Sequence, residues 1–253
     1  MRSSNFNLSG HAPMKKIFIS LFAALALGLT AGAQTNFQIL YDLGRKHLTT
    51  TLEGFHQDKW GNTFFFIDYD YNDRDEGGKV FSPNSTYFEI ARCLNFWSGS
   101  ALAPLSVQIE YNGGFGTWGN LAGTGYGAFA VNSAFLLGVD WFLHSEDFNN
   151  TLNLKLLYKH IVNMEQKVPL QFTTVWGLQN LFGLKGLSFC GFADFWCEGS
   201  NLVVLSEPQL WFQVFDHFNI GGEVELSYNF AGLEASTGRK FNVLPCIGTK
   251  WVF

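Results

Sequence analysis

Apolar and polar residues alternate with a period of two along most of this chain, from near Phe37 to the last residue. Successive side chains of a β-strand point to opposite faces, so this alternation predicts strands with one apolar and one polar face. It is clearest in four apolar series: Leu105, Val107, Ile109 and Tyr111; Val131, Phe135, Leu137, Val139, Trp141 and Leu143; Leu152, Leu154, Leu156 and Tyr158; and Val224, Leu226, Tyr228 and Phe230. The fold is therefore predicted to be all-β.

Two architectures produce such alternation. A soluble sandwich turns its apolar faces inward, and a transmembrane barrel turns them outward to the lipid. The alternating stretches approach the ten or so residues that cross a membrane at a tilt, whereas soluble strands average about five or six. Aromatic residues reach 17%, with Phe 27, Tyr 8 and Trp 8, which is typical of interfacial girdles. A transmembrane antiparallel β-barrel is therefore favoured over a sandwich.

The breaks between the alternating stretches predict the number of strands. Eleven breaks fall near Arg45 and near residues 58–62, 72–84, 98–103, 113–127, 144–150, 163–167, 180–183, 198–201, 216–219 and 231–239. They imply about twelve strands, an even number that places both termini on the periplasmic side. The longest breaks, around Asp75, Gly119 and Ser236, fall on the opposite side, where such barrels carry their external loops.

The first 33 residues have the pattern of a leader for export. Met14, Lys15 and Lys16 form a positive segment, Ile17 to Leu29 an apolar one, and Ala31-Gly32-Ala33 a small-residue cleavage site. The alternative, a membrane anchor, is disfavoured because the apolar segment is shorter than the roughly 20 residues that span a bilayer. We expect residues 1–33 to be an N-terminal extension and cleaved signal peptide, and residues 34–253 to be one barrel domain.

Charge and motifs exclude several classes of function. The net charge is −5 and becomes more negative once the basic leader is removed, which argues against nucleic acid as a partner. No H-E-x-x-H or G-x-S-x-G motif occurs, so no metal, cofactor or enzymatic activity is expected. A barrel enzyme acting on lipid through His144 or Ser133 is a weaker alternative, because no motif spacing pairs these residues.

The four cysteines match no zinc or redox spacing. Cys190 and Cys197 are the nearest pair in sequence, but on one extended strand they would lie roughly 23 Å apart, too far for a disulfide. Cys93 and Cys246 lie far from both in sequence. All four are therefore expected to be small packing residues.

The end of the chain carries a candidate assembly signal. Apolar and aromatic residues occupy every second position of a closing strand, at Pro245, Ile247, Thr249, Trp251 and Phe253. A chance terminal phenylalanine is the alternative explanation. We assign Trp251 and Phe253 to recognition by the barrel-assembly machinery of the bacterial outer membrane.

Several segments resemble the Tsx-like nucleoside-specific channel family. They are residues 49–55 (TTTLEGF), 58–60 (DKW), 64–70 (FFFIDYD) and 88–90 (FEI). The chain looks closest to an uncharacterised outer-membrane branch of that group, the DUF5020-like proteins, through residues 40–42, 192–196, 206–209 and 223–226. The resemblance implies a twelve-stranded monomeric barrel whose narrow lumen passes nucleosides. Its likeness to characterised channels is concentrated in the first third, so no individual nucleoside-contacting residue is carried over.

The polar face of each strand predicts the lumen wall, because a lysine or arginine facing lipid at the bilayer midplane costs about 2 to 4 kcal/mol. A register slip of one residue would invert a strand. The predicted inward residues are Glu53, Phe64, Phe66, Asp68, Asp70, Glu110, Asp140, Lys155, Lys159, Asp194, Trp196, Glu207, Gln209, Trp211, Glu223, Glu225 and Lys250. Aromatic rings there could stack on a flat solute while carboxylates bind its hydroxyls. Alternatively, the charges cross-link and fill a closed barrel.

These observations favour a narrow diffusion channel in the bacterial outer membrane for small polar solutes, nucleosides among them. Its expected partners are the lipid bilayer, the barrel-assembly machinery and the solute, and it is expected to be a monomer without a cofactor. The main alternative is a plugged barrel that acts as a scaffold and transports nothing.

Deletion of Trp251 to Phe253 should leave a processed but unassembled periplasmic protein, because the assembly signal is lost. Cell fractionation and the heat-dependent gel mobility of the barrel would measure this outcome. A heat-modifiable barrel of normal abundance in the outer membrane of the deletion strain would contradict the assigned role.

Overall fold

The computed structural model describes residues 33–71, 83–119 and 126–253. The predicted leader lies outside this part of the chain, except for Ala33, where the first strand begins. The strands are β1 (Ala33–Asp42), β2 (Leu48–Asp58), β3 (Gly61–Tyr71), β4 (Pro83–Leu94), β5 (Leu105–Gly119), β6 (Tyr126–His144), β7 (Asn150–Ile161), β8 (Leu170–Gln179), β9 (Leu187–Glu198), β10 (Asn201–Ser206), β11 (Gln209–Phe215), β12 (Phe218–Tyr228) and β13 (Phe241–Val252).

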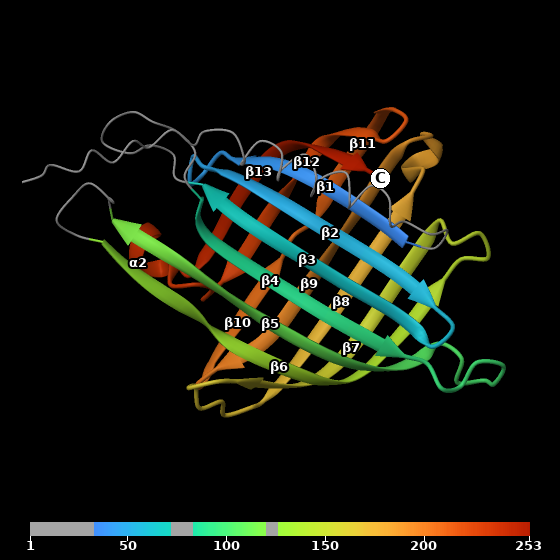
Figure 1. Ribbon diagram of the computed structural model, residues 1–253, viewed down its shortest axis with the longest axis horizontal. Helices are drawn as coiled ribbons and strands as arrows, with labels where there is room; N and C mark the ends of the chain where they lie inside the picture. The colour runs from blue at the N-terminus through green and yellow to red at the C-terminus, as the bar shows by residue number, and fades with distance from the viewer. Residues whose placement is uncertain (1–32, 72–82, 120–125) are drawn as a thin grey trace, which may run out of the picture.

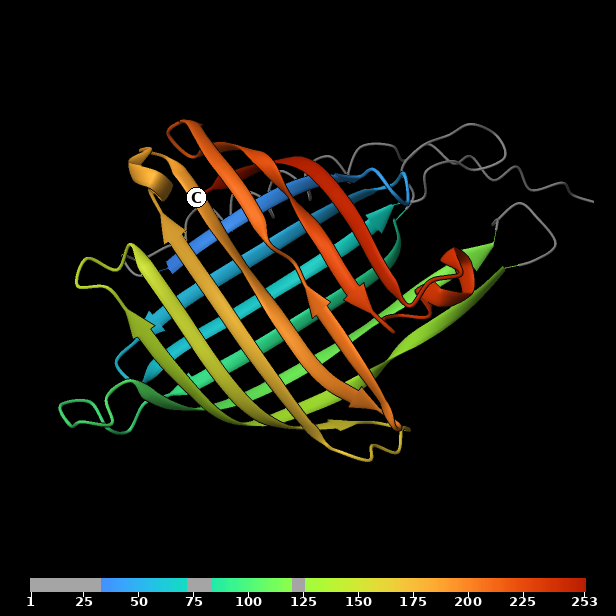
Figure 2. The same cartoon turned by 180° about the vertical axis from the view of Figure 1, so that it is seen from behind.

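The strands form one antiparallel sheet that closes on itself. Apart from β10 and β11, which both pair with β9 and β12, each strand pairs with its neighbours along the chain, and β1 pairs with β13 from Asn36–Val252 to Asp42–Cys246. Figures 1 and 2 show the tilted strands wrapping round a single barrel. Closure leaves none of the described strands with a free edge, so the backbone groups find partners within the wall, as a membrane interior demands.

The thirteen strand segments occupy twelve positions in the wall. Both β10 and β11 lie between β9 and β12, and the register does not change between the pairs Ser206–Leu226 and Gln209–Glu223. The interruption between them is Pro208, which has no N–H to donate. The predicted number of about twelve strands is confirmed.

Opposite Pro208, the wall requires a glycine. Gly191 has a φ of 149°, and a Cβ atom there would lie 2.3 Å from the carbonyl oxygen of Glu207. This is a close approach of two backbones, which only glycine allows.

The connections fall at two ends of the barrel. The termini end holds the beginning of β1, the end of β13 and the connections 59–60, 95–104, 145–149, 180–186 and 216–217. The loop end holds the connections 43–47, 162–169, 199–200 and 229–240, and β3 and β5 end there while β4 and β6 begin there. The predicted breaks 72–84 and 113–127 lie partly outside the described residues. Every other predicted break overlaps a connection. The break predicted over 113–127 is too wide, because β5 and β6 extend to Gly119 and from Tyr126.

Two short helical segments lie in the described connections. The 3-10 turn η1 (Leu181–Gly183) is at the termini end, and α2 (Leu233–Thr237) is at the loop end, on the left in Figure 1. Within the described ranges, no helix has the length and apolar character needed to cross a membrane.

The outer face of the barrel is apolar. Leu137, Trp141 and Ile109 project from it and are each more than half exposed. Other exposed apolar side chains surround the barrel: Ile39, Tyr41, Ile90, Phe135, Val139, Leu156, Tyr158, Leu170, Phe172, Phe195, Leu202, Leu210, Phe212, Ile220, Val243, Ile247 and Trp251. Soluble proteins rarely expose apolar surface on this scale, so the outer face is a lipid-facing surface.

The inner face carries the packed core. One cluster joins Leu136, Leu157, Trp196 and Val203 with Ala134 and Ile161. A smaller cluster joins Leu40, Trp211 and Cys246. The barrel interior is therefore partly filled by apolar side chains, although most of the predicted inward residues are polar.

A β-bulge in β6 makes the predicted alternation wrong for part of that strand. In the pairing of β5 with β6, Asn112 faces Ala134 but Gly114 faces Val131, so two residues of β6 oppose one of β5. Beyond this bulge, Val131 lies on the inner side, and the prediction that it shares the outer face with Phe135 is wrong. Bulges reverse side-chain parity without any strong signal in the sequence.

Adjacent leucines on β6 test the two faces. Leu136→Ala removes a side chain that is only 2% exposed and should lower the free energy of unfolding by about 2–5 kcal/mol, because a cavity remains. Leu137→Ala, on the lipid face, should cost less, since lipid chains fill the space. Urea unfolding of both variants in detergent micelles would measure the difference. Equal losses would show that the assignment of faces is wrong.

Candidate functional site

The side chains predicted to line the lumen lie on the inner face of the barrel. On β2 to β4, Glu53 pairs with Phe66, and Phe66 pairs with Glu89, which places the three side chains on one face. Some inner contacts skip a strand: the Lys155 Nζ of β7 donates to Gln108 Oε1 of β5 at 2.9 Å. Such contacts form where side chains converge, on the concave side. Solute binding by these residues stays a prediction.

An aromatic strip runs along the inside of β3 and β4. The ring centroids of Phe64 and Phe66 lie 6.2 Å apart, and those of Phe66 and Tyr87 lie 5.9 Å apart. All three rings are half-buried, and Tyr87 donates its hydroxyl to Glu89 Oε1 at 2.7 Å. Flat apolar faces beside carboxylates suit a ring compound with hydroxyl groups.

Carboxylates beside the strip are fixed by hydroxyl and amide donors. Thr51 donates to Asp68 at 2.5 Å, and Thr49 and Ser85 both donate to Asp70, at 2.7 and 2.8 Å. In addition, the Asn36 amide donates to Glu53 at 2.8 Å. These acceptors are therefore oriented by their neighbours, while their other lone pairs are left for further donors.

On the neighbouring strands β5 to β7, charges cross-link within the wall. Asn153 donates to both oxygens of Asp140 at 2.9 Å, and Lys155 Nζ lies 4.0 Å from Asp140 Oδ2. The Gln108 amide donates to Glu110 at 2.6 Å. Asp140 and Glu110 are buried, so here the structural role considered for the inward charges applies.

Two lysines lie over inner tryptophan rings. Lys159 Nζ is 4.2 Å from the ring centroid of Trp196, and Lys250 Nζ is 4.3 Å from that of Trp211. Lys159 also donates to Gln171 at 2.6 Å. These cation–π contacts hold the ammonium groups within the wall.

Asp194 and Gln209 complete the placement of the predicted residues. Asp194 accepts a hydrogen bond from Thr173 at 2.5 Å. Gln209 accepts one from Trp211 Nε1 at 2.8 Å and donates to Glu223 at 3.0 Å. Both are inner residues that link neighbouring strands.

The inner charged residues missed from the sequence include Asp42, Glu89, Glu198 and Arg45. The three acids sit at polar positions of alternating strands, so parity could have found them; Glu198, for example, accepts a hydrogen bond from the inner Trp196 Nε1 at 3.1 Å. Arg45 lies in the turn between β1 and β2, where alternation gives no direction. Its guanidinium pairs with Asp42 Oδ2 at 2.5 Å and with Glu225 Oε2 at 2.9 Å, so it reaches inside the loop end of the barrel.

The inner side chains differ in their accessibility to water. The predicted residues whose side chains water reaches, called the accessible wall below, are Glu53, Phe64, Phe66, Asp68, Asp70, Lys155, Asp194, Glu207, Gln209, Glu223 and Lys250. The predicted residues that are buried are Glu110, Asp140, Lys159, Trp196, Trp211 and Glu225. The accessible predicted residues come from β2, β3, β7, β9, β11, β12 and β13 and from Glu207, between β10 and β11.

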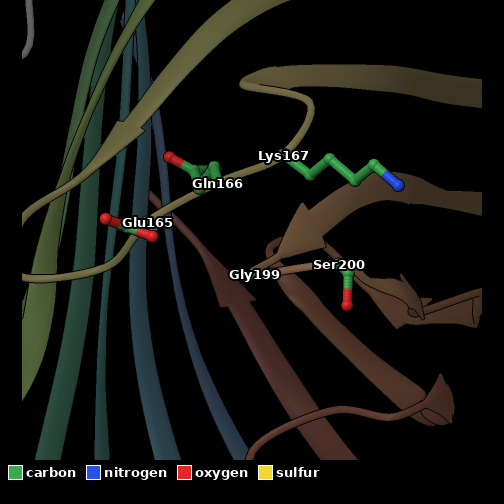
Figure 3. A pocket seen from close by; sticks show the side chains of 5 residues that line it. All are labelled: Glu165, Gln166, Lys167, Gly199 and Ser200. Atoms are coloured by element: carbon green, nitrogen blue, oxygen red, sulfur yellow. The ribbon is translucent and has the colours of Figure 1, made fainter.

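A shallow pocket at the loop end lies between two turns and is lined by Glu165, Gln166, Lys167, Gly199 and Ser200 (Figure 3). The Lys167 N–H donates to the Gly199 carbonyl at 2.8 Å, and the Gln166 amide donates to Cys197 O at 3.1 Å. Glu165 and Lys167 point away from one another in Figure 3. The pocket is part of the barrel rim, where hydrogen bonds join the two turns, and its side chains do not form a cluster of functional groups.

The residues of the weaker enzyme hypothesis are not brought together. Ser133 exchanges a hydrogen bond with Tyr111 on the outer face, whereas His144 stacks on Phe148. They lie eleven positions apart on β6, which corresponds to roughly 36 Å along the strand. Within the described ranges, His, Cys, Asp and Glu form no group of three that could hold a metal ion.

The cysteines are free thiols in the structure. Cys93 and Cys246 are buried, and Cys190 and Cys197 are partly buried. Cys190 and Cys197 are seven residues apart on β9, so an odd spacing turns them to opposite faces. The expected role as packing residues agrees with the contact of Cys190 and Cys246 with the cluster around Trp211.

A closed antiparallel barrel with an apolar exterior and a charged interior is the architecture of outer-membrane proteins, and this chain is a bacterial outer-membrane β-barrel. The model of the DUF5020 family, described as a domain of unknown function, matches residues 34–253. The chain belongs to that family.

No curated protein matches the chain. Among solved structures, it is similar to the KdgM porin, with 9% identity over 87% of this chain and 99% of that one, at a TM-score of 0.48. It is also similar to the translocator domain of the autotransporter NalP from Neisseria meningitidis, with 10% identity over 96% of both chains and a TM-score of 0.46. For the outer membrane protein Omp33 of Acinetobacter baumannii, the identity is 10% over 89% of this chain and 100% of that one, with a TM-score of 0.40.

Proposed function

We propose that the protein is a narrow diffusion channel for small polar solutes, with nucleosides as its preferred class. The observation that carries this proposal is the accessible wall, where the aromatic strip of Phe64, Phe66 and Tyr87 runs beside oriented carboxylates. A purely structural interior would have no need to keep flat rings and acceptors within reach of water.

A nucleoside fits this chemistry in two ways. Its base offers a flat face to the rings of Phe64 and Phe66. Its sugar hydroxyls can donate to Asp68 and Asp70, each of which already accepts hydrogen bonds from neighbouring hydroxyls. The resemblance of residues 49–55 and 64–70 to nucleoside-specific channels supports the same solute, because these residues form the wall in question.

The topology of the proposed channel follows from its connections. We place the termini end in the periplasm and the loop end outside, since outer-membrane barrels keep both termini inside the cell envelope. We further propose that the chain acts as a monomer, is exported with cleavage of its leader and is inserted by the barrel-assembly machinery through Trp251 and Phe253.

A scaffold without transport is the second candidate. The apolar cluster around Leu136, Leu157 and Trp196 supports it, because these side chains fill part of the lumen. The two functions differ in conductance, since a plugged barrel passes no ions.

Purified protein in planar bilayers should conduct in KCl, and a nucleoside such as adenosine should reduce the current as it occupies the lumen. Phe66→Ala should weaken this block, because a base–aromatic stack contributes about 1–3 kcal/mol, or ~5- to 150-fold in affinity. The neighbouring Phe65→Ala, on the lipid face, is the matched control and should leave the block unchanged. If the barrel never conducts, the scaffold function is supported. If Phe66→Ala leaves the adenosine block unchanged, the aromatic strip is not the nucleoside-binding surface.

The channel should pass potassium more readily than chloride. Nine acids were predicted on the inner face against three lysines; Asp42 and Glu89 add carboxylates and Arg45 one cation. Acidic pore walls favour cations and neutral solutes, so uncharged nucleosides should also be preferred to nucleotides. Reversal potentials across a KCl gradient would measure the selectivity. Clear anion selectivity would refute this account of the lumen.

A further inference from the structure

We propose that the loop-end half of the interior holds a binding site for small organic ammonium ions, formed by Glu207, Glu223, Glu225 and Ser227. These four residues are called the carboxylate row below. The proposal rests on the proposed function to the extent that solutes reach the row through the lumen. It goes beyond the general cation preference because it names one site and one class of ligand.

The register of the wall brings the row together. Glu207 of the β10–β11 strand lies directly opposite Glu225 of β12, between the paired positions Ser206–Leu226 and Gln209–Glu223. Glu223 and Ser227 are the next inward positions on either side of Glu225, because inner residues recur at every second position. Three carboxylates and one hydroxyl thus occupy adjoining inner positions.

The positive charge beside the row is too small to balance it. Arg45 pairs with Glu225 through Oε2 alone and shares its guanidinium with Asp42. Lys250, the other cation that interacts with Glu223, lies over the ring of Trp211, and Glu223 also accepts a hydrogen bond from Gln209 at 3.0 Å. Two cations thus face three carboxylates of the row and Asp42. The carboxylate of Glu207 interacts electrostatically with those of Glu223, Asp68 and Glu225. Like charges facing one another across two strands destabilise a sheet, so the row favours an additional cation.

Two buried atoms of the row have no hydrogen-bond partner within the described part of the chain. They are Glu225 Oε1 and Ser227 Oγ, on residues that are only 5% and 1% exposed. Leaving a buried polar atom unpaired costs about 1–3 kcal/mol, and more when the group is charged. These atoms offer an acceptor and a hydroxyl to a ligand that supplies N–H donors.

An ammonium group fits the row better than a metal ion does. Within the described ranges, no group of three or more carboxylate, imidazole or thiol side chains is close enough to hold a metal ion. Hard cations need several oxygens at about 2.0–2.6 Å. A primary ammonium group instead donates three hydrogen bonds over longer distances, which acceptors on neighbouring strands can satisfy. Glu207 and Glu223 are partly accessible, so an amine can enter from the lumen.

Titration calorimetry of the folded barrel in detergent with putrescine, a diamine, tests the proposal. Its uncharged counterpart 1,4-butanediol should give no binding heat. Glu207→Gln should weaken putrescine binding at least tenfold, and Ser227→Ala about threefold. Glu110→Gln is the matched control, because it removes one buried carboxylate elsewhere in the wall, and it should change the affinity less than twofold. Heat-dependent gel mobility would verify that each variant is folded.

The test uses variants of Glu207 and Ser227 and avoids Glu225. Glu225→Gln would also remove an ion-pair partner of Arg45 and can unfold the barrel. Absence of putrescine binding, or equal affinity in Glu207→Gln, Ser227→Ala and Glu110→Gln, would overturn the site and indicate that the carboxylates share protons instead. Conductance in KCl is judged separately. A barrel that binds putrescine but passes no current would refute the channel and keep the site, and a conducting barrel without putrescine binding would do the reverse.

Discussion

Every other feature of this protein depends on the backbone pairing of its first and last strands. Seven residue pairs join β1 to β13, and they turn a sheet with two edges into a ring with none. Lipid offers no hydrogen bonds to an open strand, so this seam allows the wall to exist in a membrane. Closure also divides the alternating side chains into an inside and an outside. On β6, for example, Leu137 meets lipid, while the adjacent Leu136 points into the barrel.

The strand pattern could be predicted from the sequence because lipid and lumen impose opposite chemistries at every second residue. Lysines and carboxylates such as Lys155 and Asp140 set the parity of their strands, since neither tolerates lipid. Contacts across several strands could not be predicted in this way. The ring of Trp196 beneath Lys159 depends on the curvature of the closed wall, and a linear pattern does not contain it.

Bulges and turns were the other features that could not be predicted from the sequence. The bulge beside Ser133 turns Val131 to the inner side, although the apolar character of the stretch does not change. Arg45 lies in a turn, where periodicity says nothing about direction, yet its guanidinium joins Asp42 to Glu225. In the first case the local φ and ψ angles set which face the side chain occupies. In the second, the length of the arginine side chain lets it enter the barrel from a turn. Neither depends on the hydrophobicity of the residue.

The break between β10 and β11 has a mechanical consequence. Proline contributes no N–H at position 208, so its pair with Val224 of β12 keeps only the bond from the Val224 N–H to the Pro208 carbonyl, and Gly191, its neighbour on β9, has no side chain. Among the described strands, this is the position in the wall that two strand segments share. Glu207 is the residue next to Pro208. A change in the distance between the strands at this joint also changes the distance between the carboxylates of Glu207 and Glu225. The width of the lumen and the density of negative charge along it therefore both depend on the position of Glu207.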